Sequence, residues 1–422
     1  MATMRDYLTW RGDLAFAERP FNDVDALILA TLSYLDFGGI VPSPSASRQD
    51  GAEGAIGFPT IRGACTALLE KASGDLAPFV KSMATLDEEL VHLIGSSERF
   101  GPLVLHDYVD FVEEGSSLQF SAVRVGLGEG GPADEYVSFR GTDLSLTGWR
   151  EDLMLSFTVT RAQEMAYEYL TEVLGEGSSA IVGGHSKGGN LAAYSVADRE
   201  ARKLKNVIRV YSFDGPGMDR SVHPGGVSEA MGERFCRIQP EFSVVGEIFD
   251  RKETPRTYVK STADALMQHD PTSWEVGISG FVCADAIDES ASLLNKILAT
   301  WLDGIEMEDR AAFTRELFDI LSAGGATDLS ELTKVDNMQR VFAAAAGASD
   351  EMKALLGRFA EVGADYARRA AGDAYGKAIA GMQDSAVRGA RDLVDVASRK
   401  VRSGTSDLVA AWSDFVDSLG RG

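Results

Sequence analysis

The order of strand-like and helix-like segments between residues 157 and 213 constrains the fold most. A helical pattern over 161–174 is followed by the apolar run Ala180-Ile181-Val182, a glycine-rich turn, a helix over about 190–200 and a strand over 207–213. Strands that alternate with helices pair in parallel, because the helix carries the chain back across the sheet. This order predicts an α/β fold with a mainly parallel central sheet flanked by helices.

The segments on either side of this region have other patterns. Residues 104–111, 118–125 and 134–139 are short strand candidates separated by turns, which is typical of an opening meander. Before them the chain is mostly helical, with apolar residues at helical spacing over 22–37 after a candidate Asn22 cap and further helices over 61–72 and about 86–94. Beyond about residue 290, strands give way to amphipathic helices rich in Ala, Leu, Glu and Arg. We therefore expect a helical N-terminal segment over 1–100 integrated with an α/β core over 101–290, and a helical C-terminal extension over 291–422.

Charge and cysteine content limit the partners and the compartment. The net charge of −23 repels nucleic-acid phosphates and anionic lipid head groups. Three cysteines spread over the chain suit neither a disulfide framework nor a zinc site, which indicates a reducing compartment. The chain has no stretch of about 18 uncharged apolar residues and no signal-peptide pattern at its start. We expect a cytoplasmic protein with no membrane span, no nucleic-acid partner and no metal or organic cofactor.

The sharpest motif is Gly184-His185-Ser186-Lys187-Gly188, which lies between the apolar run and the following helix. A G-x-S-x-G sequence in this position is typical of a nucleophilic serine on a sharp strand-to-helix turn, where small residues are needed two positions to either side. The helix that follows directs backbone N–H groups and its positive dipole end at a developing oxyanion. The pattern predicts Ser186 as a nucleophile; the structural alternative is a tight glycine turn with an incidental serine.

A serine nucleophile needs a general base, and the chain has five histidines: His92, His106, His185, His223 and His269. The first two precede the serine, whereas hydrolases with this motif place the acid and then the histidine after it. His185 adjoins the serine, and we expect its side chain to point away from the site. The prediction is therefore His269, in a loop after a strand over 257–260, with His223 as the alternative.

The acid that orients the histidine is expected between the serine and the histidine, at the end of a strand. Asp214 follows the strand over 207–213 and is the first candidate. Aspartate before Gly215-Pro216 is also a common turn former, so a structural reading stays open. The reserve candidates are Asp219, Glu241, Glu247 and Asp250.

An oxyanion hole is predicted after the strand that ends near Phe139. Thr142 carries both a backbone N–H and a hydroxyl on the loop that follows, and it is predicted to complete an oxyanion hole with the backbone N–H of Lys187. Ion pairs or caps from Arg140, Asp143 and Asp152 are expected to hold this loop.

With these residues assembled, the chain resembles the class 3, or fungal-type, lipases, which are α/β-hydrolases. The matching pieces are Phe139-Arg140-Gly141-Thr142, Trp149 with Asp152, Gly184-His185-Ser186 with Gly188-Gly189, and Phe213 before Gly215-Pro216. It is more similar still to a bacterial lipase-like family, a domain of unknown function, through Tyr7-Leu8, Trp10-Arg11-Gly12-Asp13, Asp25 to Phe37, Asp214-Gly215-Pro216-Gly217 and Gln268-His269-Asp270. The resemblance covers roughly residues 5 to 280, and it implies an α/β-hydrolase fold and a Ser-His-Asp triad that cleaves carboxylic esters.

The chain departs from the class 3 pattern at two places. Lys187 stands where these lipases usually have leucine, and an ammonium at the pocket mouth is expected to disfavour long bare acyl chains, since burying it unpaired is costly. The Asp-x-Val-Pro segment that carries their acid is replaced by Phe242-Ser243-Val244-Val245-Gly246. Either Asp214 has taken over as the acid or the triad is incomplete.

Two functions follow from these observations. The first is a serine hydrolase of carboxylic esters, acting on a lipid or an acylated small molecule. The second is a weak or inactive hydrolase scaffold used for binding or assembly, in which the C-terminal helices make the contacts, including those of a homo-oligomer. Convergence of Ser186, His269 and a carboxylate within hydrogen-bond reach would favour the first.

Overall fold

The computed structural model describes residues 1–45, 57–82, 84–112, 118–142, 150, 154, 157–174, 177–197, 206–219, 222, 227–248, 255–289, 291–292, 295–296, 299, 305–323, 325, 340, 344, 347–350 and 352–353. The chain divides into two compact units. The first comprises Met1–Leu144 and Glu151–Ala291, and the second comprises Ser145–Arg150 and Ser292–Gly422. Every described residue of the candidate site belongs to the first unit.

The helices of the first unit are α1 (Met4–Arg11), α2 (Asp23–Leu32), α4 (Ile61–Ala72), α5 (Glu88–Ser96), α7 (Arg161–Val173), α8 (Lys187–Val196) and α9 (Val227–Met231). Its 3-10 turns are η1 (Ala77–Phe79), η2 (Gly232–Arg234), η3 (Val245–Glu247), η4 (Ala265–His269) and η5 (Pro271–Ser273). The strands are β1 (Val104–Val112), β2 (Gln119–Gly126), β3 (Glu135–Phe139), β4 (Ala180–His185), β5 (Val207–Phe213), β6 (Phe235–Pro240), β7 (Thr257–Val259), β8 (Val276–Gly277), β9 (Gly280–Phe281) and β10 (Cys283–Ala284).

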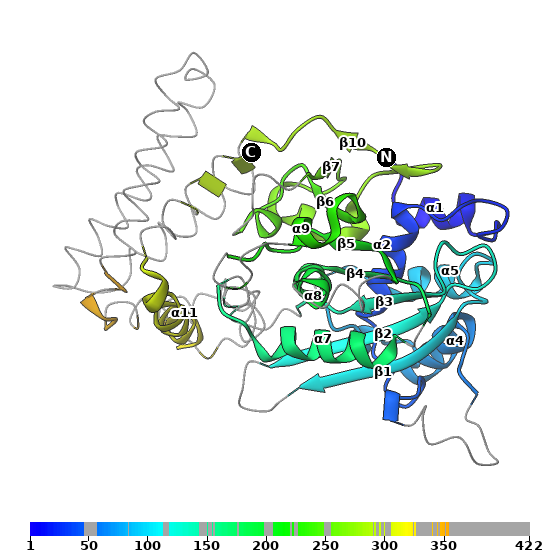
Figure 1. Ribbon diagram of the computed structural model, residues 1–422, viewed down its shortest axis with the longest axis horizontal. Coiled ribbons are helices and arrows are strands. Elements are labelled where there is room, and N and C mark those ends of the chain that lie inside the picture. The colour runs from blue at the N-terminus through cyan, green and yellow to red at the C-terminus, as the bar shows by residue number, and fades with distance from the viewer. Residues whose placement is uncertain are drawn as a thin grey trace. The chain divides into compact units, whose positions relative to one another are not determined.

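The described strands form a mixed eight-stranded sheet in the order β1-β2-β3-β4-β5-β6-β7-β10, with β8 and β9 as a separate pair. Strands β3 to β7 are parallel to one another, and helices lie between several of them in the chain (Figure 1). Strands β1, β2 and β3 form the opening meander and pair antiparallel with one another in sequence order. The last strand, β10, pairs antiparallel with β7. The sheet is therefore mixed, because too few residues separate β1 from β2 and β2 from β3 for the crossover that a parallel pair needs.

Each face of the sheet carries its own apolar core. Alternate residues of a strand point to opposite faces. Tyr136 and Ile181 accordingly pack with residues of α1, α2, α4 and α5, whereas their neighbours Val137 and Val182 pack with residues of α7, α8 and α9. The helices thus cover both faces, and Figure 1 shows α7 and α8 on one of them.

Helix α2 is fixed at its start and along its length. Its N-cap is Asn22, as the sequence predicted: the Asn22 side chain accepts from Val24 N, and Asp25 accepts in return from Asn22 N. This reciprocal capping box satisfies two otherwise unpaired donors. Strand β3 holds the helix through Tyr136, whose hydroxyl donates to Ala26 O at 2.8 Å, and Ser138, whose hydroxyl donates to Ala30 O at 3.1 Å. The residues just after α2, including Tyr34, are therefore held against the sheet.

The described part of the second unit is mainly helix α11 (Met307–Ser322). Ser349 donates to the Glu316 carboxylate through its backbone N at 2.7 Å and its hydroxyl at 2.8 Å, which ties a later segment to this helix. The remainder of the helical extension expected over 291–422 lies outside the described residues and stays a prediction. None of the described helices has the length and apolar character needed to cross a membrane.

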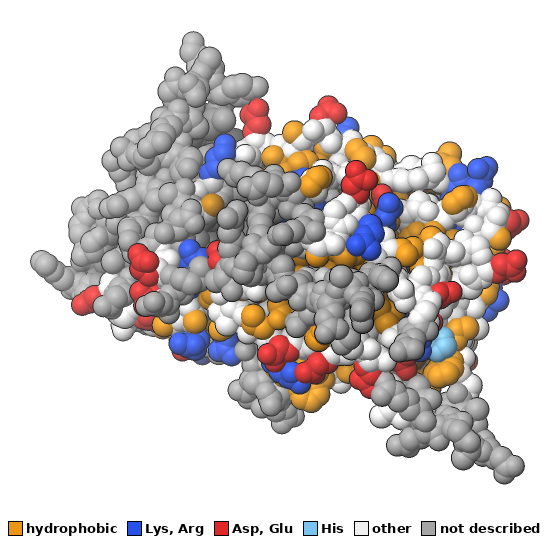
Figure 2. All heavy atoms as spheres, in the orientation of Figure 1, with side chains coloured by type: hydrophobic (Ala, Val, Ile, Leu, Met, Phe, Trp, Pro, Cys, Tyr) orange, Lys and Arg blue, Asp and Glu red, His pale blue; other side chains and the backbone are white. Residues whose placement is uncertain are grey.

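Figure 2 shows one face of the molecule, on which the described Lys and Arg side chains lie among Asp and Glu side chains. Interspersed charges of both signs are typical of a solvated surface. On this described surface, the large negative net charge is therefore tempered by nearby cations.

Candidate active site

The carboxyl ends of neighbouring parallel strands bring the predicted site residues to one edge of the sheet. Strand β4 ends at His185, strand β5 ends at Phe213, and these two residues are partners in the register. The residue that follows each strand is a predicted site residue: Ser186 after β4 and Asp214 after β5. Ser186 N donates to Phe213 O at 2.9 Å, which fixes the two turns to each other. Ligands of open α/β sheets bind at this edge.

Ser186 occupies a strained strand-to-helix turn. Its backbone has φ 57° and ψ −130°, a conformation that residues with a side chain rarely adopt, and α8 begins at the next residue. The flanking glycines allow the turn to close. A Cβ atom on Gly184 would lie 2.6 Å from Phe139 O and closer still to the Gly188 carbonyl, and one on Gly188 would overlap Phe139 O. The glycine requirement of the motif is thus steric.

The predicted nucleophile, base and acid lie in one hydrogen-bonded series. His269 Nε2 lies 2.9 Å from Ser186 Oγ, and His269 Nδ1 lies 2.6 Å from Asp214 Oδ2. All three side chains are buried. Because an ionised carboxylate only accepts hydrogen bonds, Nδ1 carries the ring proton and Nε2 is left to accept from the serine hydroxyl.

The Asp214 carboxylate is held by groups that no sequence pattern pointed to. Its Oδ1 accepts from the Ser243 hydroxyl and from Gly246 N. Both residues belong to the stretch that replaces the Asp-x-Val-Pro segment of class 3 lipases, and this replacement was the available signal. The segment that carries the acid in those lipases follows β6, and here it supplies hydrogen-bond donors to an acid that follows β5, one strand earlier.

Arg237 on β6 contacts the two turns that surround the Asp214 carboxylate. Its guanidinium donates to Gly246 O and, at 3.4 Å, to Gly215 O. Burial, together with the nearby Arg256, lowers the pKa of Arg237 to about 10, so it stays charged at neutral pH. Arg237 therefore joins the turn after Asp214 to the turn that donates to Asp214.

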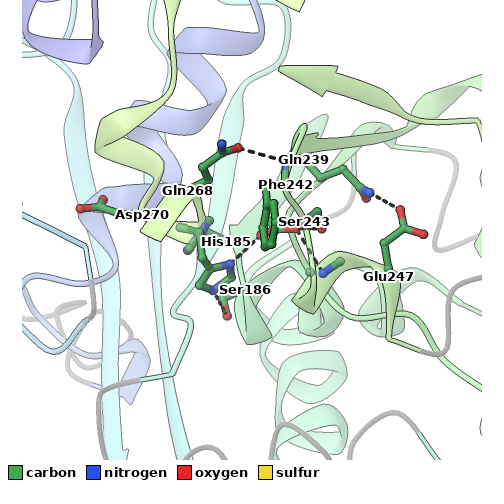
Figure 3. A network of polar contacts seen from close by, with 12 residues as sticks. His185, Ser186, Gln239, Phe242, Ser243, Glu247, Gln268 and Asp270 are labelled. Atoms are coloured by element: carbon green, nitrogen blue, oxygen red, sulfur yellow. Dashed lines mark hydrogen bonds and ion pairs between the residues drawn. The ribbon is translucent and has the colours of Figure 1, made fainter. Parts of the chain in front are cut away.

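The segment around His269 is anchored on both sides. Gln268 Oε1 accepts from Phe242 N at 3.0 Å, and the Trp274 indole donates to Gln268 O at 2.8 Å. On the other side, Asp270 accepts from the Thr85 hydroxyl at 2.7 Å. Figure 3 shows Gln268 turned toward Phe242, with Ser186 and Ser243 close by. These contacts hold the 3-10 turn that carries His269.

The expectation that the His185 side chain points away from the site is wrong. Its ring lies against that of His269, with centroids 4.7 Å apart. His185 Nε2 lies 2.8 Å from His269 O, and His185 Nδ1 lies 2.7 Å from the Tyr34 hydroxyl. Burial, with a smaller contribution from the neighbouring His269, holds the pKa of His185 well below its usual value.

The Lys187 side chain is also not where it was expected. It does not stand at a pocket mouth: it is 1% exposed, and its ammonium donates to Gln119 O at the start of β2, at 2.9 Å. The motif fixes the backbone of this residue next to Ser186 but leaves the direction of its side chain to tertiary packing. The buried, hydrogen-bonded ammonium therefore gives no reason to expect that Lys187 disfavours long acyl chains.

Thr142 lies on the segment that follows β3 and is 4% exposed. The residue before it, Gly141, packs closely against the strand-to-helix turn at His185 and Ser186, which we call the elbow: a Cβ on Gly141 would lie 2.6 Å from His185 O. Thr142 is therefore the next residue after Gly141, which lies against the backbone of His185, the residue before Ser186. Arg140 forms an ion pair with Asp110 at 2.8 Å, a structural contact of the expected kind.

The other sequence candidates are either elsewhere or outside the described residues. Glu247 accepts from Arg256 at 3.0 Å and from the Tyr258 hydroxyl at 3.2 Å. His106 packs on the ring of Phe58, with centroids 4.4 Å apart. The residues that lie outside the described ranges are Asp143, Trp149, Asp152, His223 and Asp250.

Comparison with known proteins gives a family and a coarse structural likeness. The Mbeg1-like family model matches residues 94–319, which is more than half of the 422-residue chain. A solved structure titled "Crystal structure of M37 lipase" is similar at 14% sequence identity and a TM-score of 0.31, over 53% of this chain and 67% of that one. No curated protein matches the chain. On the family match, the chain belongs to the Mbeg1-like family, a lipase-like family.

Proposed function

We propose that this protein is a serine hydrolase of carboxylic esters, with Ser186 as nucleophile, His269 as general base and Asp214 as the orienting acid. The observation that carries the proposal is the continuous series of hydrogen bonds from Asp214 Oδ2 through His269 to Ser186 Oγ, with distances of 2.6 and 2.9 Å. Nucleophile, base and orienting group within hydrogen-bond reach are the signature of covalent catalysis by serine. Membership of a lipase-like family is consistent with it.

The reaction takes place in two halves. Ser186 Oγ attacks the ester carbonyl carbon while His269 Nε2 takes the hydroxyl proton, and the tetrahedral intermediate then expels the alcohol, which leaves with that proton. Water next attacks the acyl-serine, with His269 again taking and returning a proton, so that the carboxylic acid is released and Ser186 is restored. Asp214 stabilises the imidazolium that forms in each half.

The oxyanion of each intermediate is bound by the backbone N–H of Lys187 and by Thr142. Support for Lys187 comes from its position as the first residue of α8, because the first N–H groups and the positive dipole end of a helix both favour negative charge. Support for Thr142 comes from its burial on the segment that packs against His185 O through Gly141.

The substrate is the ester of a lipid or of an acylated small molecule. With the Lys187 ammonium bonded to Gln119 O, nothing in this side chain's position disfavours an apolar acyl group. We further propose that the protein works in the reducing cytoplasm, which is supported by its cysteines, Cys65, Cys236 and Cys283, all being unpaired thiols in the described structure.

The alternative of an inactive scaffold is weakened by the carboxylate beside His269. Burying a serine, a histidine and an aspartate costs free energy unless they are hydrogen-bonded to one another. A scaffold that does not catalyse a reaction gains nothing from this arrangement. The backbone strain at Ser186 points the same way, because strain of this kind gathers at functional sites.

Hydrolysis of p-nitrophenyl esters of graded acyl length tests the proposal. The wild-type protein is expected to cleave at least one member of the series, and Ser186→Ala is expected to lose at least about 10³-fold of that activity. Thermal unfolding is measured on both proteins to establish that the variant is folded. A folded Ser186→Ala with undiminished activity would contradict the proposal.

A further inference from the structure

His185 and Tyr34 form a hydrogen-bonded pair that ends on the backbone of His269. The Tyr34 hydroxyl lies 2.7 Å from His185 Nδ1, and His185 Nε2 lies 2.8 Å from His269 O. Tyr34 is 1% exposed and His185 is 3% exposed. A buried polar pair with both ring nitrogens engaged constrains the groups at each end.

The chemistry of the partners fixes which atoms carry protons. A backbone carbonyl only accepts hydrogen bonds, so His185 Nε2 must carry the proton that it donates to His269 O. In a neutral ring, Nδ1 is then an acceptor, and the Tyr34 hydroxyl donates to it. The low pKa of His185, which follows from its burial, keeps the ring in this neutral form at physiological pH. The donors run in one direction, from Tyr34 through His185 to His269 O.

The pair also touches the two other segments of the site. His185 directly precedes Ser186 on the elbow. The Tyr34 hydroxyl lies so close to Gly141, the residue before Thr142, that a side chain there would overlap it. Tyr34 itself is held by its place just after α2, which β3 binds through Tyr136 and Ser138. The pair thus joins the elbow, the segment before Thr142 and the His269 turn.

We propose that Tyr34 and His185 are positioning residues that fix the backbone of His269, and so hold its ring between Ser186 and Asp214. This inference rests on the proposed function only for its kinetic consequence, since the position of the ring can be measured without substrate. We assign His185 no contact with the reacting atoms. It acts through the His269 carbonyl and through the face of the His269 ring, 4.7 Å from its own centroid.

The neutral form of His185 also matters for the charge that develops on His269. The groups that face its ring are the Tyr34 hydroxyl, the His269 ring and the Trp274 indole, whose centroid is 6.2 Å away. During the reaction His269 becomes an imidazolium, and a second cation at this distance would oppose that charge. A neutral ring that donates to a carbonyl avoids this repulsion.

Proton NMR of the full chain in water tests the position of the ring directly. The His269 Nδ1 proton, in its short bond to Asp214, should give a far-downfield resonance, which Asp214→Asn should abolish and so assign. His185→Phe keeps an aromatic ring but lacks the donor, and it should broaden or remove the resonance. Tyr169→Phe is the matched control for Tyr34→Phe, because it also removes one buried hydroxyl, which donates to Asp107 O at 2.8 Å. Tyr169 packs in the core on the other face of the sheet from Tyr34, so this variant should leave the resonance in place.

Ester hydrolysis gives the kinetic test. His185→Phe should lower kcat on the order of 10²-fold with little change in KM, as expected when a reacting group is misplaced. His185→Gln should restore most of this loss, because an amide keeps one acceptor for Tyr34 and one donor for His269 O. Tyr34→Phe should lower kcat by roughly tenfold, about the worth of one hydrogen bond.

The outcomes separate the two proposals. If the wild-type protein cleaves no ester, the proposed function fails, and the resonance in His185→Phe still decides whether the pair positions His269. If His185→Phe does not fold, Tyr34→Phe and His185→Gln decide it. The inference is overturned if His185→Phe or Tyr34→Phe keeps a wild-type resonance, or if Tyr169→Phe disturbs it as much as Tyr34→Phe does.

Discussion

Replacing Asp214 by asparagine should change the tautomer of His269 while leaving the turn in place. Two donors, the Ser243 hydroxyl and Gly246 N, approach Oδ1, and His269 Nδ1 approaches Oδ2 at 2.6 Å. An asparagine has one amide oxygen and one NH₂ group. Because Gly246 N–H only donates, the amide oxygen is held on that side and the NH₂ group turns toward His269.

The consequence for catalysis follows from the proton inventory. An NH₂ group facing Nδ1 makes that nitrogen an acceptor, so the ring proton moves to Nε2, which can no longer accept from Ser186 Oγ. The expected loss in kcat is on the order of 10⁴-fold, the effect of the same change in serine proteases. This corresponds to roughly 5 kcal/mol of barrier height. Asparagine keeps the volume and the two bonds at Oδ1, so little change in the free energy of unfolding is expected.

The assay is steady-state hydrolysis of the best p-nitrophenyl ester, with thermal unfolding measured on the same preparations. Glu247→Gln is the matched control, because it makes the same carboxylate-to-amide change nearby at a residue bonded to Arg256 and Tyr258. It should lose stability rather than kcat. If Asp214→Asn stays within about tenfold of the wild-type kcat, the tautomer argument fails and Asp214 is not the orienting acid.

Three further predictions concern the residues around the nucleophile. Lys187→Met should leave the acyl-chain preference unchanged in a graded ester series, because the ammonium is bonded to Gln119 O; a shift toward longer chains would mean that it reaches the substrate. Gly188→Ala should cost about 1–3 kcal/mol or more and lower the melting temperature, because its Cβ would overlap Phe139 O; an unchanged melting temperature would refute the steric reading. His185 has a lower pKa in the folded protein than in the unfolded chain, so it binds a proton more readily when the chain is unfolded. It should therefore lower the free energy of unfolding of the wild type by up to about 1.4 kcal/mol for each pH unit below roughly 6.5. Denaturant titrations should show a shallower loss for His185→Gln, and equal slopes would contradict the low pKa.

The sequence predicted those parts of the fold and site that depend on local patterns. The apolar run before Ser186 and the helix after it specify β4 and α8, and the glycines specify the turn between them. Asp214 was predicted as a candidate because it follows an apolar strand in the same way. In the described sheet the parallel order extends only from β3 to β7, since the connections between the earlier strands are too short for a crossover and permit antiparallel pairing.

The parts that escaped prediction depend on contacts between distant residues. Tyr34 and His185 are 151 positions apart, and no periodicity within either segment reports that they meet. Ser243 lies in a stretch whose importance the sequence signalled only through the loss of the usual acid. Lys187 was placed wrongly because a motif determines the backbone beside the nucleophile, whereas the side chain follows the packing against β2.

The most direct test of the account is covalent labelling of the native protein with a fluorophosphonate, followed by mass spectrometry of the peptides. The phosphonyl group should be found on Ser186, the label should be absent from Ser186→Ala, and Asp214→Asn should react much more slowly than the wild type. Labelling at another residue, or equal labelling of wild type and a folded Ser186→Ala, would contradict the claim that Ser186, His269 and Asp214 form a working catalytic site.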